Sequence, residues 1–283
     1  VLNVIATTRA AEVVEPLLRG GIVRKLSFTG STATGRLLLE QCAGTIVRTS
    51  LELGGNAPFI VFDDADLDVA IEAAVAAKMR NMGEACTAAN RFFVHTAVAE
   101  EFTARLTARL QAMTVGNGLD QGTDVGPLID QAAIAKVERL VADAVSRGAT
   151  VHTGGSALAG QGYFYPPTVL SDVAPQSQIL RTEVFGPVAP ILTFADEAEV
   201  IETANDTEWG LVGYVITADL NRATRLSAAL EVGMVGINTG IVSDVAAPFG
   251  GIKQSGLGRE GGHLGIDEYL NHKYIAVPTP PSV

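Results

Sequence analysis

The segment Lys25-Leu26-Ser27-Phe28-Thr29-Gly30-Ser31-Thr32-Ala33-Thr34-Gly35 is typical of a short strand, a glycine-bearing turn and the first turn of a helix. Residues 36–42 continue as a helix with one apolar side, and residues 45–53 follow as a strand rich in β-branched side chains. The alternation continues, with strands predicted at 57–62, 188–194, 212–217 and 235–238 and helices at about 67–82, 99–113, 130–147 and 221–231. Alternating elements predict an α/β fold with mostly parallel sheets.

The beginning of the chain is short for this kind of fold. The one strand–helix–strand unit within residues 25–53 does not build a doubly wound nucleotide-binding sheet, which needs several such units. We therefore expect that N-terminal elements are missing or that another chain supplies them. The first residue, Val1 rather than Met, fits a truncated chain.

Composition excludes several classes of function. The 283 residues carry 20 Lys and Arg against 31 Asp and Glu, a net charge of −11, which argues against binding to nucleic acid or to an anionic membrane. No long apolar run and no signal-peptide pattern stands out. Two cysteines provide neither a disulfide framework nor a Cys-rich metal site, so we expect a cytoplasmic protein without a metal.

Cys86 is a candidate nucleophile. A free cysteine is most often a buried apolar residue, and Cys42, inside an apolar helix, fits that description. Cys86 instead follows a long helix in the glycine-containing turn Met82-Gly83-Glu84-Ala85-Cys86. A packing residue more often lies inside the helix, so both a buried thiol and a reactive thiolate remain open for Cys86.

Glu52 is a candidate base in Leu51-Glu52-Leu53-Gly54-Gly55. A glutamate between two leucines at a strand end is costly to bury without a partner. It is either an exposed acid on an edge strand or a carboxylate with a raised pKa that serves as a general base. The two glycines would allow a tight turn that leaves the carboxylate facing a cleft.

Three further segments carry weaker signals. The turn at Gly30 and Ser31 offers backbone N–H groups and a helix N-terminus to a phosphate, although its hydroxyls serve equally well as helix caps. The segment Glu183-Val184-Phe185-Gly186-Pro187 pairs an acid with an aromatic ring, which suits a ribose and a flat base or simply a turn with a core Phe. Residues 248–262 hold six glycines in fifteen positions and predict an irregular, close-packed loop.

Together these motifs resemble the aldehyde dehydrogenase superfamily. Phe-Thr-Gly-Ser at 28–31, Glu-Leu-Gly-Gly at 52–55, Gly-x-x-Cys at 83–86, Glu-Val-Phe-Gly-Pro at 183–187 and the glycine-rich run at 248–260 stand in that family's order and spacing. The resemblance covers essentially the whole chain but only the C-terminal part of a typical member. Residues 236–243, 255–261 and 265–270 look most like succinate-semialdehyde dehydrogenases.

The resemblance implies a mechanism. Cys86 as thiolate would attack an aldehyde, its own backbone N–H would help to hold the oxyanion, hydride would pass to NAD or NADP, and Glu52 would activate water to release the acid. The cofactor-binding residues implied are Gly30 and Ser31 for the pyrophosphate, Glu183 for the nicotinamide ribose, and Leu53 and Phe185 for the nicotinamide neighbourhood.

Two residues are implied in the choice of substrate. Arg80, six residues before Cys86, would pair with the distal carboxylate of a semialdehyde, although an Arg in the last turn of a helix is also an ordinary complement to the helix dipole. Ser243 matches a serine that contacts this carboxylate in semialdehyde enzymes. The expected substrate is succinic semialdehyde, oxidised to succinate.

Two positions depart from the family pattern. Glu84 stands where members usually have Gln, and a carboxylate so near the nucleophile would raise the pKa of the thiol unless it points away. Ala88 stands where some semialdehyde dehydrogenases have a second cysteine. We therefore expect no disulfide switch at this position.

The resemblance also implies the organisation of the chain. Residues 1–53 would be the remainder of an incomplete Rossmann-type cofactor-binding domain, residues 54–250 an α/β catalytic domain, and residues 251–283 a C-terminal loop and oligomerisation segment with a strand at about 273–277. The complete protein would be a homodimer or homotetramer.

Three alternatives stay open. In the first, the same chemistry serves another aldehyde. In the second, the chain is a cofactor-free thiol esterase that uses Cys86 and Glu52, and in the third it is a non-catalytic assembly fragment. Because most of the family's cofactor-binding sheet and its oxyanion-hole asparagine would precede Val1, we expect that this chain alone is inactive.

Overall fold

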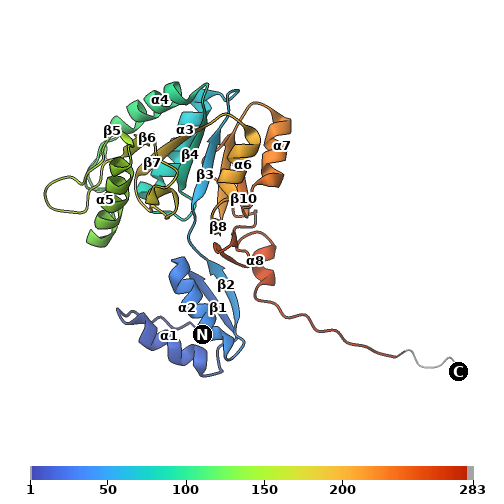
Figure 1. Ribbon diagram of the computed structural model, residues 1–283. Coiled ribbons are helices and arrows are strands. Elements are labelled where there is room, and N and C mark those ends of the chain that lie inside the picture. Colours follow the sequence, from blue (N-terminus) through green and yellow to red (C-terminus); the bar gives the residue numbers. More distant parts are fainter. Residues whose placement is uncertain (1, 279–283) are drawn as a thin grey trace.

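The computed structural model describes residues 2–278 and shows an α/β protein built on two main sheets (Figure 1). A small sheet has the order β1-β2-β12, with β1 and β2 parallel. A seven-stranded sheet has the order β10-β9-β3-β4-β7-β6-β5, and only β5 pairs antiparallel within it. The mostly parallel α/β fold predicted from the sequence is therefore confirmed.

The strands have the following bounds. The small sheet consists of β1 (Lys25–Thr29), β2 (Arg48–Glu52) and β12 (Gly256–Leu257). The large sheet consists of β3 (Ala57–Val61), β4 (Ala89–His95), β5 (Thr150–Thr153), β6 (Thr168–Ser171), β7 (Val188–Phe194), β9 (Val212–Ile216) and β10 (Met234–Ile237). A short antiparallel pair, β8 (Trp209–Gly210) and β11 (Ile252–Lys253), completes the strands of the described residues.

Helices cover both faces of the large sheet, and the first two helices pack with the small sheet. They are α1 (Ala10–Arg19), α2 (Thr32–Ala43), α3 (Leu67–Met79), α4 (Ala99–Gln111), α5 (Gln131–Ser146), α6 (Glu197–Asn205), α7 (Leu220–Ala229) and α8 (Leu264–Asp267), with 3₁₀ turns η1 (Arg80–Gly83) and η2 (Gln178–Leu180). Phe59 and Val61 of β3 pack with α3 and α4, whereas Ile60 packs with α6 and α7. This alternation follows from the two-residue period of side chains along a strand.

The small sheet packs with the first two helices. Leu18 of α1 joins Leu38 and Cys42 of α2 in an apolar cluster with Val47. Cys42 is only 2% exposed, so its predicted role as a buried packing residue is confirmed. The large sheet and this small unit lie one above the other, joined by the chain between β2 and β3 (Figure 1).

Several element boundaries differ from the sequence predictions. The helix predicted to run to Met82 ends at Met79, because Asn81 and Met82 adopt left-handed backbone conformations that cannot continue a right-handed helix. The strand predicted at about 273–277 does not form within the chain. That segment runs away from the body of the molecule (Figure 1), and Tyr274 is 90% exposed.

No helix of residues 2–278 combines the length and apolar character that a membrane span requires. The predicted end of the C-terminal segment, residues 279–283, and Val1 lie outside the described residues.

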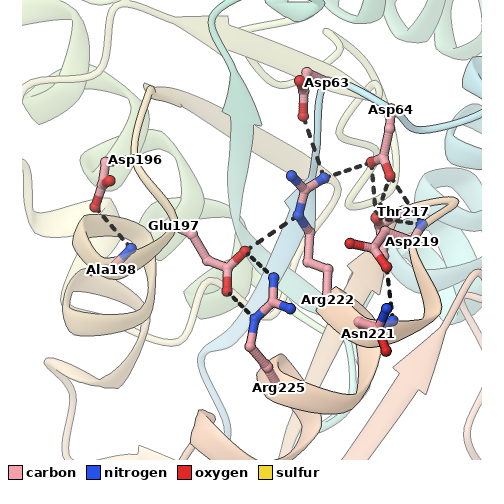
Figure 2. Close-up of polar contacts among 10 residues, drawn as sticks. All are labelled: Asp63, Asp64, Asp196, Glu197, Ala198, Thr217, Asp219, Asn221, Arg222 and Arg225. Atoms are coloured by element: carbon pink, nitrogen blue, oxygen red, sulfur yellow. Dashed lines mark hydrogen bonds and ion pairs between the residues drawn. The ribbon is translucent and has the colours of Figure 1, made fainter.

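The carboxyl ends of β3 and β9 are joined by a charged network centred on Arg222 of α7 (Figure 2). Its guanidinium lies 2.8 Å from Asp64 and 3.3 Å from both Asp63 and Glu197. Asp64 also accepts the Thr217 hydroxyl at 2.8 Å. The order of the sheet reverses between β3 and β9, and such a switch point is where open α/β sheets ordinarily bind ligands. Here the Arg222 side chain fills it.

We predict that Arg222→Ala lowers the free energy of unfolding by about 1–3 kcal/mol, because three carboxylates then lie together without their shared cation. The pKa values of Asp64 and Glu197 lie below their ordinary values, with the hydrogen bonds from Thr217 and Arg225 and the charge of Arg222 opposing burial. The stabilisation is therefore present above the ordinary carboxyl pKa and is lost as the pH falls through the lowered values.

Denaturant unfolding at pH 7 and at pH 3 measures this effect. Arg225→Ala serves as the control, since Arg225 pairs with Glu197 from a more exposed position, where an ion pair contributes about 0–1 kcal/mol. Equal losses for the two variants at pH 7 would refute a central role for Arg222.

Candidate active site

A cleft of about 730 Å³ lies where the two sheets meet, at the amino ends of β3, β4 and β7. All nine candidate residues from the sequence line it: Gly30, Ser31, Glu52, Leu53, Arg80, Cys86, Glu183, Phe185 and Ser243. They come from five stretches of the chain (30–31, 52–53, 80–86, 183–185 and 243), so only the fold brings them together. Their chemical roles remain predictions.

The loop that carries Cys86 is built on an unusual turn. After α3 ends, Asn81, Met82 and Gly83 have φ values of 51°, 54° and 78°. A Cβ on Gly83 would lie 2.3 Å from the carbonyl oxygen of Gly186, so the close approach of these two loops requires glycine. The turn places Cys86 in the cleft, three residues before β4 begins.

Glu52 ends β2 with only 4% of its surface exposed. One of its carboxylate oxygens is buried without a hydrogen-bond partner among the described residues. Burial and the nearby charge of Glu260 raise the pKa of Glu52 to about 8, although Arg259 opposes them. A carboxylate with such a pKa binds a proton readily near neutral pH, which is the property that a general base needs.

Gly54 and Gly55 form the crossover from β2 to β3. Gly54 lies against Glu183, and Gly55 lies against the backbone of Cys86. The Gly55 N–H donates to the Glu183 carboxylate at 3.0 Å. A Cβ on Gly54 would lie 2.8 Å from Glu183 Oε2, and a Cβ on Gly55 would lie 2.5 Å from the Cys86 carbonyl oxygen. Close approach to the Cys86 backbone therefore requires glycine at position 55, whereas a side chain at position 54 would displace the Glu183 carboxylate.

The pKa of the Cys86 thiol lies above its ordinary value because the thiol is buried and because Glu183 and Glu52 are negatively charged. The backbone N–H groups of Cys86 and Thr87 oppose this rise. N–H groups that favour a thiolate are also suited to an oxyanion that forms beside the sulfur. The loop therefore supplies N–H donors for negative charge at the sulfur or beside it.

Glu84, the carboxylate that departs from the family pattern, points away from the thiol. Its Oε1 accepts the backbone N–H of Ile129 at 3.1 Å, just before α5 begins. The largest charge effects that raise the pKa of Cys86 come from Glu183 and Glu52.

The turn at Gly30 and Ser31 fits the phosphate of a dinucleotide. Gly30 and Ser31 form the turn before α2, and a Cβ on Gly30 would lie 2.5 Å from the Phe28 ring. The Ser31 hydroxyl caps α2 by accepting the Thr34 N–H at 3.2 Å, and the phosphate-binding role of the turn stays a prediction. The same turn leaves a helix N-terminus at the cleft, where a phosphate binds favourably.

Lys136 of α5 and Phe249 also line the cleft but were not selected from the sequence. Burial lowers the pKa of Lys136, while the charge of Glu183 opposes this. Lys78 lies deeper, 1% exposed, and donates to Asn90 at 3.0 Å. Both lysines interrupt an apolar run of their helix, α3 for Lys78 and α5 for Lys136. That interruption was the sequence feature that could have identified them. Within residues 2–278, no group of three or more His, Cys, Asp or Glu side chains could hold a metal ion.

Comparison with known proteins gives the family. The model of the "Aldehyde dehydrogenase family" matches residues 1–275. This chain belongs to the aldehyde dehydrogenase family. The resemblance seen in the sequence motifs is thereby confirmed, as is an aldehyde dehydrogenase fold.

The relatives of this aldehyde dehydrogenase chain include semialdehyde dehydrogenases. It is 53% identical to a succinate-semialdehyde dehydrogenase of Paenarthrobacter nicotinovorans, over 99% of this chain and 62% of that protein. It is also 53% identical to a glutarate-semialdehyde dehydrogenase of Pseudomonas putida, over 98% of this chain and 57% of that protein.

Among solved structures, an NADP-dependent enzyme of Escherichia coli matches this aldehyde dehydrogenase chain with a TM-score of 0.93 and 53% identity, over 96% of this chain and 56% of that one. The chain thus spans a little over half the length of the relatives that it matches.

We predict that Glu52→Gln raises the melting temperature at pH 8.5 but leaves it nearly unchanged at pH 4. Because the pKa of Glu52 is raised on folding to about 8, the stability linked to its bound proton is present below the ordinary carboxyl pKa and is lost as the pH rises toward 8. The glutamine amide carries no charge at either pH, so the variant does not lose this stability as the pH rises.

Glu268→Gln is the matched control with the opposite sign. Glu268 accepts hydrogen bonds from Lys25 and Ser50, which help to hold its pKa below the ordinary value against the effect of burial. Its substitution should therefore lower the melting temperature at pH 8.5. A Glu52→Gln variant that is less stable than the parent at pH 8.5 would contradict the assignment.

Proposed function

We propose that the chain carries the nucleophile, the base and the nicotinamide side of the active site of an NAD(P)+-dependent semialdehyde dehydrogenase. The observation that carries the proposal is the meeting of Cys86, Glu52 and Glu183 around the Gly54–Gly55 crossover in one cleft. A partly buried thiol flanked by N–H donors and a buried carboxylate with a raised pKa are the groups that acyl transfer requires. The semialdehyde relatives support the choice of substrate class.

In this proposal, Cys86 adds to the aldehyde carbon. Loss of the thiol proton is favoured by the N–H groups of Cys86 and Thr87, which oppose the effects of burial and of the two nearby carboxylates. The Cys86 N–H then stabilises the oxyanion of the adduct. Glu52 takes a proton from the water that releases the acid, because its raised pKa makes it an effective acceptor near neutral pH.

Glu183 and the turn at Gly30 and Ser31 would hold NAD or NADP. A carboxylate anchored by the Gly55 N–H suits a ribose diol, and the N-terminus of α2 suits a pyrophosphate. When bound, the nicotinamide supplies the hydride acceptor that the oxidation needs. The NADP dependence of the Escherichia coli relative supports NADP as one of the two cofactors.

Arg80 and Ser243 would select a substrate with a distal carboxylate. Both side chains line the cleft with Cys86, and Arg80 is largely exposed to it. A guanidinium binds a carboxylate through two parallel hydrogen bonds, which gives both affinity and orientation. Succinic semialdehyde is the substrate that we favour.

We propose that residues 1–53 belong to the cofactor-binding domain, 54–250 to the catalytic domain and 251–283 to an oligomerisation segment. Exposed apolar side chains support assembly into a homodimer or homotetramer, since Tyr274, Ile275 and Val277 are at least 72% exposed and apolar surface of this kind favours association. We place the protein in the cytoplasm.

We predict that succinic semialdehyde protects Cys86 from alkylation by iodoacetamide, because a thiohemiacetal removes the free thiolate. The rate of alkylation at Cys86 is measured by mass spectrometry with and without the aldehyde. Cys86→Ser should show no label at this position, whereas buried Cys42 reports any unfolding. An alkylation rate that the aldehyde does not change would refute the nucleophile.

Formation of reduced cofactor, followed by absorbance with NAD+ or NADP+, distinguishes the dehydrogenase from a cofactor-free thiol esterase. An esterase would hydrolyse activated esters without either cofactor, and Cys86→Ser would abolish that turnover. Ester turnover that survives this substitution would exclude Cys86 as its nucleophile.

We predict that Arg80→Ala weakens protection by succinic semialdehyde about tenfold or more and leaves protection by butanal within about twofold, because only the former has a carboxylate to pair. The concentration of each aldehyde that halves the alkylation rate is the measured quantity. Equal weakening for both aldehydes would exclude a carboxylate-binding role.

A further inference from the structure

The turn between α3 and Cys86 has an energetically unfavourable backbone. Asn81 and Met82 both have left-handed conformations, with φ 51° and ψ 43° and with φ 54° and ψ 24° respectively. Such a conformation costs a non-glycine residue free energy and persists only where its surroundings enforce it. Two such residues occur in succession here, four and five positions before the candidate nucleophile Cys86. The contacts around them must therefore stabilise the turn.

Two contacts within the turn account for part of its stability. The Asn81 side chain donates to the Glu84 carbonyl oxygen at 2.9 Å, and the Glu84 N–H donates to the Asn81 carbonyl oxygen at 2.8 Å. The Met82 side chain packs against both large apolar clusters of the catalytic region. These contacts fix the shape of the turn, but the hydrogen bonds involve only the turn itself.

One polar contact ties the turn to another element. Glu84 Oε1 accepts the Ile129 N–H at 3.1 Å, which lies one residue before Asp130, the N-cap of α5. Ile129 is 45 residues away in sequence. Glu84 is partly buried, and burial raises its pKa while the Ile129 N–H opposes this. The charged groups that face Glu84 are Asp130 and Lys136, both from the α5 side.

We propose that Glu84 is a positioning residue that latches the left-handed turn to the start of α5 through the Ile129 N–H, and thereby holds Cys86 and Arg80 in the cleft. The inference rests on the proposed role of Cys86 as nucleophile. The role requires an acceptor oxygen and not a negative charge, so a glutamine carbonyl oxygen at this position could accept the same N–H.

The latch acts on the thiol through burial. Burial is the largest cause of the raised pKa of Cys86. Releasing the turn hydrates the sulfur, lowers the pKa of the thiol and accelerates its reaction with a small alkylating reagent. The loss of one hydrogen bond should raise the population of the released turn, and hence the rate, about fivefold.

The experiment measures the rate of Cys86 alkylation by iodoacetamide between pH 6 and pH 10 in four variants of the full chain. Glu84→Ala removes the acceptor and Ile129→Pro removes the donor, so each should raise the rate at pH 8 about fivefold. Glu84→Gln keeps an acceptor and should stay within about twofold of the parent. The double variant Glu84→Ala with Ile129→Pro should match either single variant, since both break the same bond.

Alternative results are distinct. If Glu84 acts through its charge, Glu84→Gln and Glu84→Ala shift the pH profile equally, which would overturn the latch. Unchanged rates in all variants, or effects that multiply in the double variant, would also overturn it. Alkylation of buried Cys42 in the same samples reports general unfolding, and exposed Glu138→Ala on α5 is the control for loss of a nearby carboxylate.

Because alkylation requires neither aldehyde nor cofactor, the latch can fail while aldehyde protection of Cys86 succeeds. Conversely, the variants can confirm the latch while no aldehyde protects Cys86 from alkylation. That result would reject the proposed function and leave the latch standing.

Discussion

The crossover between the two sheets, residues 52–56, is the constraint on which the rest of the site depends. Leu53 N–H donates to the Ser255 carbonyl oxygen at 2.9 Å, and the buried Ser255 hydroxyl donates to the Gly54 carbonyl oxygen at 2.7 Å. Gly55 binds Glu183, and the carbonyl oxygen of Asn56 accepts from buried Arg91 at 3.0 Å. One short segment therefore fixes Glu52, at the end of the small sheet, relative to the Cys86 loop before β4 of the large sheet.

The location of the cleft explains its electrostatics. It lies at the amino ends of β3, β4 and β7, whereas the Arg222 network fills the switch point at the carboxyl ends (Figure 2). Cys86 lies seven residues after the end of α3, beyond the last helical turn in which a helix dipole acts strongly. The pKa of its thiol therefore depends on burial, on the nearby carboxylates and on local N–H donors.

The sequence predicted the elements with clear patterns and missed those decided by tertiary contacts. Strand β7 and the site motifs follow from local pattern and family resemblance, whereas β4 was missed because Asn90 and Arg91 interrupt its apolar run. Both are buried, and their partners Lys78, Asn56 and α6 lie elsewhere in the chain. The helix end at Met79 was missed for a similar reason, because apolar Met82 extends the pattern while packing between two clusters enforces a left-handed turn.

The Ser255 hydroxyl has a mechanical consequence. It donates to Gly54 and accepts from the N–H of Gly210 at 2.9 Å, so a single side chain with no exposed surface clamps the glycine crossover to β8. Glu52 ends a strand of the small sheet and Cys86 precedes a strand of the large sheet, so bending at the two adjacent glycines between the sheets would change the separation of these side chains directly. The stiffness of that joint therefore depends on a serine that forms no hydrogen bond with either side chain.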